Sequence, residues 1–330
     1  MTTRAGTRTS TRRGGVVRVH RTALRAGIRP TPEFAKKGLA SFAVNVGTKC
    51  GHGCLYCSTG AMLRMHSSFQ AARENPFGHG YAIVDPGTPE RVLRDAARIR
   101  KRGLVQLCTT VDAWAPEAQE HDLGRRCLEV LLVEPGWEVR ILTKNAAVAR
   151  DFDLIEAHGN RVRVGLSLTA VPSKQHIISV IEPNASPISE RIATLRKAHA
   201  LGLRTYAMLC PLLPGIADDP ESVRELVQVG LDVGAEEFFV EPVNGRGRGL
   251  VQTAEALDRA GFRAEASAIN AVRRAKAWSS YVHRLLEIVQ SELRAVGALP
   301  RLQFLLYSKR LVSDDLAWIR KHPQGVRWLA

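Results

Sequence analysis

Short apolar runs alternate with amphipathic helical stretches from about residue 41 to residue 244, and this alternation constrains the fold more than any other feature. The apolar runs predict strands over residues 41–47, 104–110, 137–145, 161–169, 203–215 and 235–244. The stretches between them predict helices over residues 89–103, 116–136, 146–159, 188–202 and 219–234. Strands that alternate with helices pair in parallel through right-handed crossovers. The chain is therefore expected to form an α/β fold with six βα units.

Six such units fit a partial (β/α)6 barrel of the TIM type as well as an open doubly wound sheet. No G-x-G-x-x-G sequence follows the first strand, which counts against a dinucleotide-binding sheet. A long basic helix is expected over residues 264–297, and residues 301–308 have the composition of a last strand. We therefore expect a core domain over residues 41–250 and a helical C-terminal extension over residues 251–330.

The first 40 residues form a strongly basic segment, with ten Arg and Lys side chains and one acid, Glu33. They hold most of the net charge of +15 and few apolar groups, so we expect a disordered basic leader over residues 1–40. One interpretation is an arm that neutralises the phosphates of a nucleic acid. The other is a disordered segment that only aids solubility.

The sequence favours a cytoplasmic protein with no membrane partner. No apolar run reaches the roughly 18–20 residues that a transmembrane helix requires, and the first residues lack the apolar stretch of a signal peptide. The chain has six cysteines in 330 residues, with three of them close together. This pattern is unlike a secreted disulfide framework and suits a reducing compartment.

Three cysteines, Cys50, Cys54 and Cys57, lie within eight residues at C-x3-C-x2-C spacing. Gly51 and Gly53 allow the loop between them to curl, so that three sulfur atoms face one point. Three thiolates suit a 4Fe–4S cluster that keeps one iron without a protein ligand and so available to a substrate or cofactor. We favour this interpretation of the motif.

Two other interpretations of the same spacing stay open. Structural zinc needs four ligands, and His52 within the loop is the available fourth. Residues two apart in a chain rarely surround one tetrahedral ion, however, and no second cysteine pair follows the loop. A disulfide with one spare thiol is the third interpretation.

The cysteine motif, with the aromatic Tyr56 before its last cysteine and a strand before its first, resembles that of the radical S-adenosylmethionine (SAM) enzymes. The resemblance extends to the spore photoproduct lyase-like branch, and covers about residues 40–245 through segments 108–131, 142–155, 181–203 and 211–218. It implies a partial (β/α)6 barrel with a 4Fe–4S cluster and SAM as cofactors. In that family the cluster cleaves SAM reductively, and the resulting 5′-deoxyadenosyl radical removes a hydrogen atom from the substrate.

Matching positions in the resemblance imply a set of site residues. Cys50, Cys54 and Cys57 would bind the cluster. Contacts to SAM are expected from polar residues at or near strand ends, namely Thr110, Asp112, Lys144 and Ser167, with Glu182 and Arg191 as a further pair near the ribose. SAM presents an ammonium, a carboxylate and hydroxyl groups, which such side chains can pair with. The alternative for each residue is ordinary capping or solvation.

Cys108 lies where the second predicted strand ends. In spore photoproduct lyases, a cysteine at the matching position returns a hydrogen atom to the product radical, so the resemblance implies a catalytic role for Cys108. The alternative is a small buried residue, which is the usual state of a strand cysteine. Cys127 and Cys210 are expected in the core. Ser58 stands where this branch commonly has tyrosine, so the tyrosine relay of the branch lacks that member here.

Three functions are compatible with these features. The first is a radical SAM enzyme that repairs or modifies a base in DNA or RNA, supported by the basic leader and the basic GRGRG sequence at residues 245–249. The second is a radical SAM enzyme acting on a small molecule or peptide. The third is a non-catalytic metal- or cluster-containing nucleic-acid-binding protein. Either enzyme would need a one-electron reductant of the flavodoxin or ferredoxin type as a partner.

Overall fold

A single large sheet dominates the computed structural model, which describes residues 8–12, 15–245 and 247–329. Within these residues the sheet has ten strands in the order β14-β13-β12-β11-β9-β8-β7-β4-β3, with β10 paired to β9. The strands are β3 (Ile28–Pro30), β4 (Phe42–Val44), β7 (Leu104–Leu107), β8 (Glu138–Thr143), β9 (Val162–Leu168), β10 (Arg204–Thr205), β11 (Ala207–Leu212), β12 (Phe238–Pro242), β13 (Leu302–Tyr307) and β14 (Val326–Leu329). Neighbours from β14 to β4 pair in parallel, and β3 is antiparallel to β4. All six predicted strands are confirmed.

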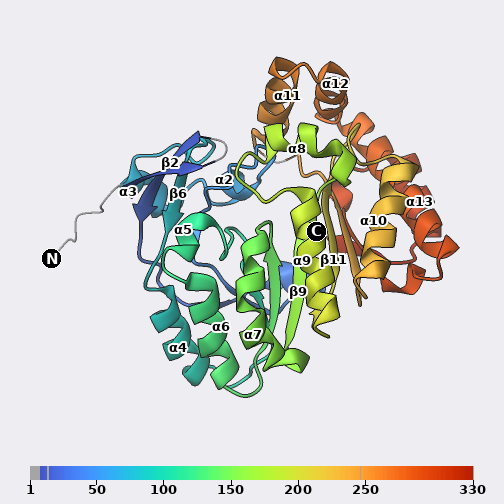
Figure 1. The fold of residues 1–330 in the computed structure, drawn as a ribbon. Coiled ribbons are helices and arrows are strands. Elements are labelled where there is room, and N and C mark those ends of the chain that lie inside the picture. The colour runs from blue at the N-terminus through green and yellow to red at the C-terminus, as the bar shows by residue number, and fades with distance from the viewer. Residues whose placement is uncertain (1–7, 13–14, 246, 330) are drawn as a thin grey trace.

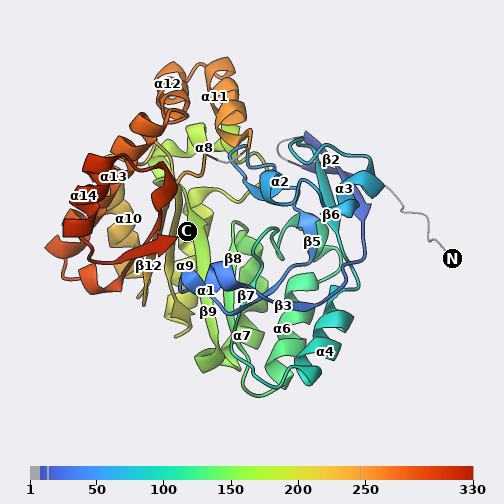
Figure 2. The same ribbon diagram turned by 180° about the vertical axis from the view of Figure 1, so that it is seen from behind.

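Helices connect the parallel strands and cover one face of the sheet (Figures 1 and 2). They are α4 (Thr88–Arg98), α5 (Pro116–Gln119), α6 (Leu123–Val133), α7 (Phe152–Glu156), α8 (Gln175–Ile181), α9 (Ile188–Ala200) and α10 (Pro220–Asp232). The predicted helix over residues 116–136 is divided into α5 and α6, and the one over 146–159 begins with a 3₁₀ segment at Ala146–Asp151. None of the helices in the described part of the chain is long and apolar enough to cross a membrane.

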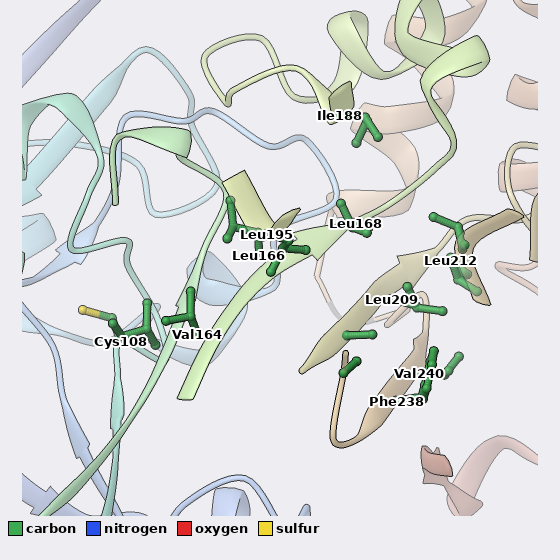
Figure 3. Packing of buried hydrophobic residues seen from close by; sticks show 14 of the residues in the cluster. Cys108, Val164, Leu166, Leu168, Ile188, Leu195, Leu209, Leu212, Phe238 and Val240 are labelled. Atoms are coloured by element: carbon green, nitrogen blue, oxygen red, sulfur yellow. The ribbon is translucent and has the colours of Figure 1, made fainter. Parts of the chain in front are cut away.

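The hydrophobic core lies between the sheet and these helices. Figure 3 shows Val164 of β9 beside Cys108, and Leu168 of the same strand on the side of Leu209 and Leu212 of β11; all are nearly or fully buried. On the other face of the sheet, Tyr206, Met208 and Phe239 belong to a second buried apolar cluster. Because the strands are thus buried on both faces, they read as near-continuous apolar runs. This is why the sequence located the strands well.

A second sheet lies apart from the large one, with strand order β1-β2-β6-β5. Its strands are β1 (Arg8–Arg12), β2 (Gly15–Arg21), β5 (Gly47–Lys49) and β6 (Tyr81–Val84), and it is flanked by α2 (Thr59–Met62) and α3 (Ser67–Ala72). Both ribbon views place it on the far side of the molecule from α10 (Figures 1 and 2). The long connection over residues 61–87 thus contains β6 of this small sheet and α3 beside it.

The prediction of a disordered leader is wrong for the described part of residues 1–40. Val17 and Val19 of β2 are buried, and β2 pairs in parallel with β6. Ile28 of β3 is buried against the large sheet, followed by α1 (Pro32–Lys36). The segment has few apolar residues, but those it has are covered by partners distant in the sequence. Residues 1–7 and 13–14 lie outside the described residues.

The C-terminal extension is only partly helical, because β13 and β14 continue the parallel sheet. Its helices are α11 (Gly249–Arg259), α12 (Arg263–Ala271), α13 (Ala275–Ala295) and α14 (Ser313–Lys321). The single helix predicted over residues 264–297 is therefore wrong, since α12 and α13 are separate. The guanidinium of Arg310 donates to the carbonyls of Val272 and Arg273 at 3.2 and 3.1 Å and satisfies the end of α12. Because this cap comes from a residue distant in the sequence, no local pattern indicates where α12 ends.

Gly165 on β9 provides a test of how tightly the strands at the site are packed. A Cβ atom there would overlap the ring of Tyr206, which is fully buried and donates its hydroxyl to the carbonyl of Ile141 at 2.7 Å. We expect Gly165→Ala to lower the free energy of unfolding by about 1–3 kcal/mol through overpacking. Urea denaturation measures this change.

The matched control is Gly159→Ala, because the position of a Cβ on Gly159 has open space around it. Its free energy of unfolding should stay within about 0.5 kcal/mol of wild type. Equal unfolding midpoints for the two variants would contradict the packing argument.

Candidate active site

The cysteine loop begins directly after β5 of the small sheet, which itself follows β4 of the large sheet in the chain. Cys50 and Cys54 are partly buried and Cys57 is exposed. All three thiols line one cavity of about 310 Å³. Burial raises the pKa of the Cys54 thiol to about 12, and burial also raises the pKa of Cys50.

Backbone hydrogen bonds hold the cysteine loop in a defined shape. Glu117 accepts the N–H of Gly51 at 2.6 Å, and Asn184 donates its amide to the Gly51 carbonyl at 2.9 Å. A side chain at Gly51 would press on the Glu117 carboxylate, and Gly53 has a φ of +70°. Gly53 therefore suits its left-handed backbone, and Gly51 leaves room for the Glu117 carboxylate that holds the loop.

The cavity opens at the carboxyl ends of the parallel strands, which is where βα barrels carry their chemistry. Sequence-predicted residues from three segments line it together with the three thiols, namely Cys108, Thr110, Asp112, Lys144 and Ser167. Glu182 and Arg191 are not among its lining residues, but contact them from behind. The structure thus brings the predicted site residues together around one cavity.

Glu182 is a fully buried carboxylate that connects the cysteine loop to the strand ends. It forms ion pairs with Arg191 and, at 3.0 Å, with Lys144. It also accepts hydrogen bonds from the hydroxyls of Tyr56 and, at 2.9 Å, Thr169. Burial alone would raise the pKa of Glu182, but the charges of Arg191 and Lys144 outweigh it and hold that pKa well below its usual range.

Lys144 and Ser167 present the polar groups of this network to the cavity. The Lys144 ammonium donates to the Ser167 hydroxyl at 3.0 Å, and that hydroxyl donates to the carbonyl of Cys210 at 2.6 Å. Arg191 donates to the Ser167 carbonyl at 2.8 Å. Lys144 is therefore held by Glu182 and Ser167, with its charge at the cavity wall.

Asp112 and Thr110 are held mainly by the backbone around them. Asp112 accepts hydrogen bonds from the Thr143 hydroxyl and the backbone N–H of Lys144, each at 2.8 Å, and from the N–H of Trp114 at 2.9 Å. The N–H of Thr110 donates to the side chain of Asn45 at 3.0 Å. These bonds fasten the ends of β4, β7 and β8 to one another.

Cys108 is 2% exposed and lies both in the core and on the cavity wall. Figure 3 shows its sulfur directed away from Val164. Burial raises the pKa of Cys108 well above its usual value, so the neutral thiol is its stable form. Cys127 lies in the core as predicted, whereas Cys210 also lines the cavity and donates its thiol to Glu241 at 3.4 Å.

Single-ion coordination is not seen in this site. Within the described residues, no three side chains of His, Cys, Asp or Glu are arranged to hold one metal ion. The His52 imidazole is buried, with Nδ1 3.5 Å from Asp112 and no hydrogen-bond partner on Nε2. The four-ligand zinc site considered from the sequence is therefore not formed in this structure.

The glycine-rich segment at residues 245–249 packs against the cysteine loop. A Cβ on Gly249 would lie 2.9 Å from the backbone of Tyr56, and one on Gly247 would lie 2.9 Å from Ala61. Arg246, one of the two arginines of this segment, lies outside the described residues. The glycines therefore have a packing role.

Sequence reasoning missed a second polar group on the cavity wall, formed by Lys37, Glu241 and Tyr307. Glu241 and Tyr307 stand at the ends of two strands that the sequence predicted, which is a signal that could have found them. Lys37 had no such signal, because its segment was assigned to a disordered leader.

Glu182→Gln tests the buried carboxylate. The variant should unfold about 3–5 kcal/mol more readily at neutral pH, because Arg191 and Lys144 keep buried charges without a counter-ion. A carboxylate with a lowered pKa stabilises the fold above its unfolded pKa of about 4.3, and this stabilisation is lost as the pH falls below that value. Wild type should therefore lose more stability than Glu182→Gln between about pH 5 and pH 3, measured by urea unfolding.

Glu90→Gln is the matched control, since Glu90 forms an exposed ion pair with Arg126. Its effect should stay below about 1 kcal/mol. If the free energy of unfolding fell equally for Glu182→Gln and wild type as the pH is lowered, the role of the buried carboxylate would be contradicted.

Two curated relatives show that similar sequences occur in an archaeal virus and an archaeon. The chain is 28% identical over 222 residues to the uncharacterized protein ORF301 of Acidianus two-tailed virus, covering 63% of this chain and 69% of that protein. It is 24% identical over 179 residues to the uncharacterized protein MJ0683 of Methanocaldococcus jannaschii, covering 54% of this chain and 63% of that protein.

Solved structures of spore photoproduct lyase share the fold. A mutant of that lyase aligns with a TM-score of 0.52 and 15% identity, over 73% of this chain and 66% of the lyase. The lyase complexed with dinucleoside spore photoproduct gives a TM-score of 0.51 and 14% identity over the same shares. A mutant with bound AdoMet and dinucleoside spore photoproduct also gives 0.51. The chain thus spans about two thirds of the length of these structures.

The family comparison covers the cavity and its cysteine loop. Residues 44–228 match the Radical SAM superfamily, which is more than half of the 330 residues. The matched segment contains the three loop cysteines, Lys144, Ser167 and Glu182. The chain therefore belongs to the radical SAM superfamily.

Proposed function

We propose that the protein is a radical SAM enzyme in which Cys50, Cys54 and Cys57 hold a 4Fe–4S cluster and the adjoining cavity binds SAM. The observation that supports this most is that three thiols and the buried network of Lys144 and Glu182 meet on one cavity at the strand ends. When bound, the cluster and SAM supply reductive cleavage of a carbon–sulfur bond and abstraction of a substrate hydrogen atom. A three-thiol donor set fits such a cluster, since one iron is left for SAM.

The polar residues of the site form two groups: those that would contact SAM, and those that hold the contacting residues in position. Lys144 is positioned to pair with the carboxylate of SAM, and Ser167 and Thr110 with its hydroxyl or amino groups. Glu182 and Arg191 lie behind the wall, so we assign them to positioning Lys144 and Ser167. Asp112 likewise holds the strand ends through hydrogen bonds from three donors.

We propose a nucleic-acid base as the substrate. The net charge of +15 suits a polyanionic partner. The fold is shared with a lyase whose structures contain dinucleoside spore photoproduct. A small molecule or peptide is the alternative substrate, and a non-catalytic nucleic-acid-binding module is the alternative function. A flavodoxin- or ferredoxin-type protein in a reducing cytoplasm would supply the electron.

Cys108 is the proposed hydrogen-atom donor to the substrate. Its neutral thiol lies on the cavity wall, and the S–H bond would break as a C–H bond forms on the substrate radical. This leaves a thiyl radical on Cys108. One electron from the reductant and one proton return it to the thiol.

The cluster assignment is tested by Cys54→Ala, with Cys127→Ala as the matched control because Cys127 is buried in α6. After anaerobic reconstitution, wild type and Cys127→Ala should bind about four irons per chain. Both should form 5′-deoxyadenosine from SAM under reductant. Cys54→Ala should lose most of its iron and this activity, and full retention of both would refute the assignment.

The substrate assignment is tested with dinucleoside spore photoproduct and the reconstituted wild-type protein. We expect conversion of the dinucleoside that depends on SAM, followed by chromatography and mass spectrometry. Cys108→Ala should still cleave SAM but divert the product radical to other products, whereas Cys127→Ala should give the wild-type products. An unchanged product profile for Cys108→Ala would remove it as donor, and absence of conversion would count against this nucleic-acid substrate.

A further inference from the structure

A second, smaller cavity also contacts the three loop thiols. It has a volume of about 50 Å³, and Lys49 lines it together with Cys50, Cys54 and Cys57. Lys49 is the last residue of β5 and directly precedes Cys50 in the chain. The proposed function so far gives no role to this lysine.

The Lys49 ammonium is held in a fixed position by the protein. The side chain is mostly buried, and its nitrogen donates to the carbonyls of Pro76 at 3.0 Å and Gly78 at 2.6 Å. The nitrogen also lies 4.9 Å from the centre of the Tyr81 ring. These contacts come from β6 and the segment before it, so the position of the charge does not depend on the cysteine loop alone.

Lys49 differs from an ordinary buried lysine in the partners of its charge. In the described part of the chain, the acceptors of its ammonium are two neutral carbonyls and no carboxylate. The negative charge of Glu74 acts on Lys49, but Glu74 forms its ion pairs with Arg18 and His20, each at 2.9 Å. The positive charge of Lys49 is therefore left without a counter-charge of its own.

The two lysines that line the cavity of about 310 Å³ show the contrast. Lys37 pairs with Glu241 at 2.9 Å, and Lys144 pairs with Glu182 at 3.0 Å. Burying an ammonium without a negative partner costs free energy, and hydrogen bonds to neutral carbonyls recover only part of that cost. The surroundings of Lys49 therefore favour an anionic group in the small cavity.

The loop thiols can supply this negative charge. Burial lowers the pKa of Lys49, whereas negative charge on Cys57 and Cys50 raises it. Thiolates that bind a metal cluster therefore favour the charged form of Lys49, and the ammonium in turn favours the thiolates. A 4Fe–4S core with three thiolates carries a total charge of −1 when oxidised and −2 when reduced.

We propose that Lys49 is a fixed positive charge that raises the reduction potential of the cluster held by the loop thiols. Reduction adds one electron and no proton, and a neighbouring ammonium stabilises the added negative charge. A unit charge within about 12 Å, at an effective dielectric constant of about 20, changes the reduction equilibrium at least about tenfold.

This inference rests on the proposed cluster and deepens it. The potential of the cluster decides how strong a reductant is needed to place an electron on it. Lys49 would therefore set the demand on the flavodoxin- or ferredoxin-type partner, without contacting SAM or the substrate.

The experiment uses the full-length protein with its cluster reconstituted anaerobically, in the absence of SAM. Redox titration with dithionite gives the ratio of reduced to oxidised cluster at each potential, from the electron paramagnetic resonance signal of the reduced cluster. Lys49→Gln removes the charge but keeps N–H donors for the two carbonyls. At a fixed potential its ratio should be about tenfold lower than that of wild type, which is a midpoint about 59 mV lower for one electron.

Two further variants separate charge from structure. Lys49→Arg keeps a permanent positive charge, so its ratio should stay within about threefold of wild type. Lys49→Met lacks both the charge and the donors, and its midpoint should fall as far as that of Lys49→Gln.

Lys197→Gln is the matched control, because the Lys197 ammonium lies 6.0 Å from the Phe152 ring and lines neither cavity. Its midpoint potential should equal that of wild type. Circular dichroism checks the fold of each variant, and about four irons per chain are expected in all of them.

The role of Lys49 is refuted if folded, iron-loaded Lys49→Gln has the wild-type midpoint. It is also refuted if Lys49→Arg falls as far as Lys49→Gln, or if both uncharged variants lose their iron, since either result assigns Lys49 to holding the loop. Wild-type protein without a cluster would instead refute the proposed radical SAM function. A normal wild-type cluster with unchanged midpoints in the variants refutes the inference alone.

Discussion

The buried carboxylate of Glu182 is the interaction on which the site depends. It receives donors from Tyr56 in the cysteine loop, from Lys144 after β8 and from Arg191 in α9. An isolated buried carboxylate would be costly, so its partners must stay in place for the fold to keep it ionised. One charge thus fixes the distance between the thiols and the strand ends that form the rest of the cavity wall.

Hydrogen bonds from distant parts of the chain hold the backbone of the cysteine loop. Its backbone is held by Glu117 and Asn184, and the N–H of Leu55 donates to the carbonyl of Ile181 at 2.9 Å. Positions that are fixed before binding reduce the entropy that a ligand must lose on binding. In the proposed function, such a loop would present three thiols to a cluster with little rearrangement, which is the preorganisation that a catalytic site requires.

The sequence predicted the large sheet well, because strands buried on both faces are visible as apolar runs. It failed where distant segments decide the structure. Val17 and Val19 are ordered through pairing with β6, more than 60 residues away, and no local pattern shows this. The same error hid Lys37, whereas Lys144 and Ser167 were named because they match positions of the family that the cysteine loop resembles. Spacing indicated the three cysteines and the resemblance indicated the other groups, but only the fold shows which of them line the cavity and which lie behind its wall.

The cavity therefore contains two carboxylates with different capacities. Glu182 accepts hydrogen bonds from four donors and does not line the cavity, so its carboxylate interacts only with the residues that form the wall. Glu241 has one strongly paired oxygen and one that meets only a thiol, and its side chain lines the cavity. Since a carboxylate has about four acceptor positions, the first is saturated and the second can still accept a ligand. This difference in remaining acceptor capacity separates the carboxylate that holds the wall from the one that lines the cavity.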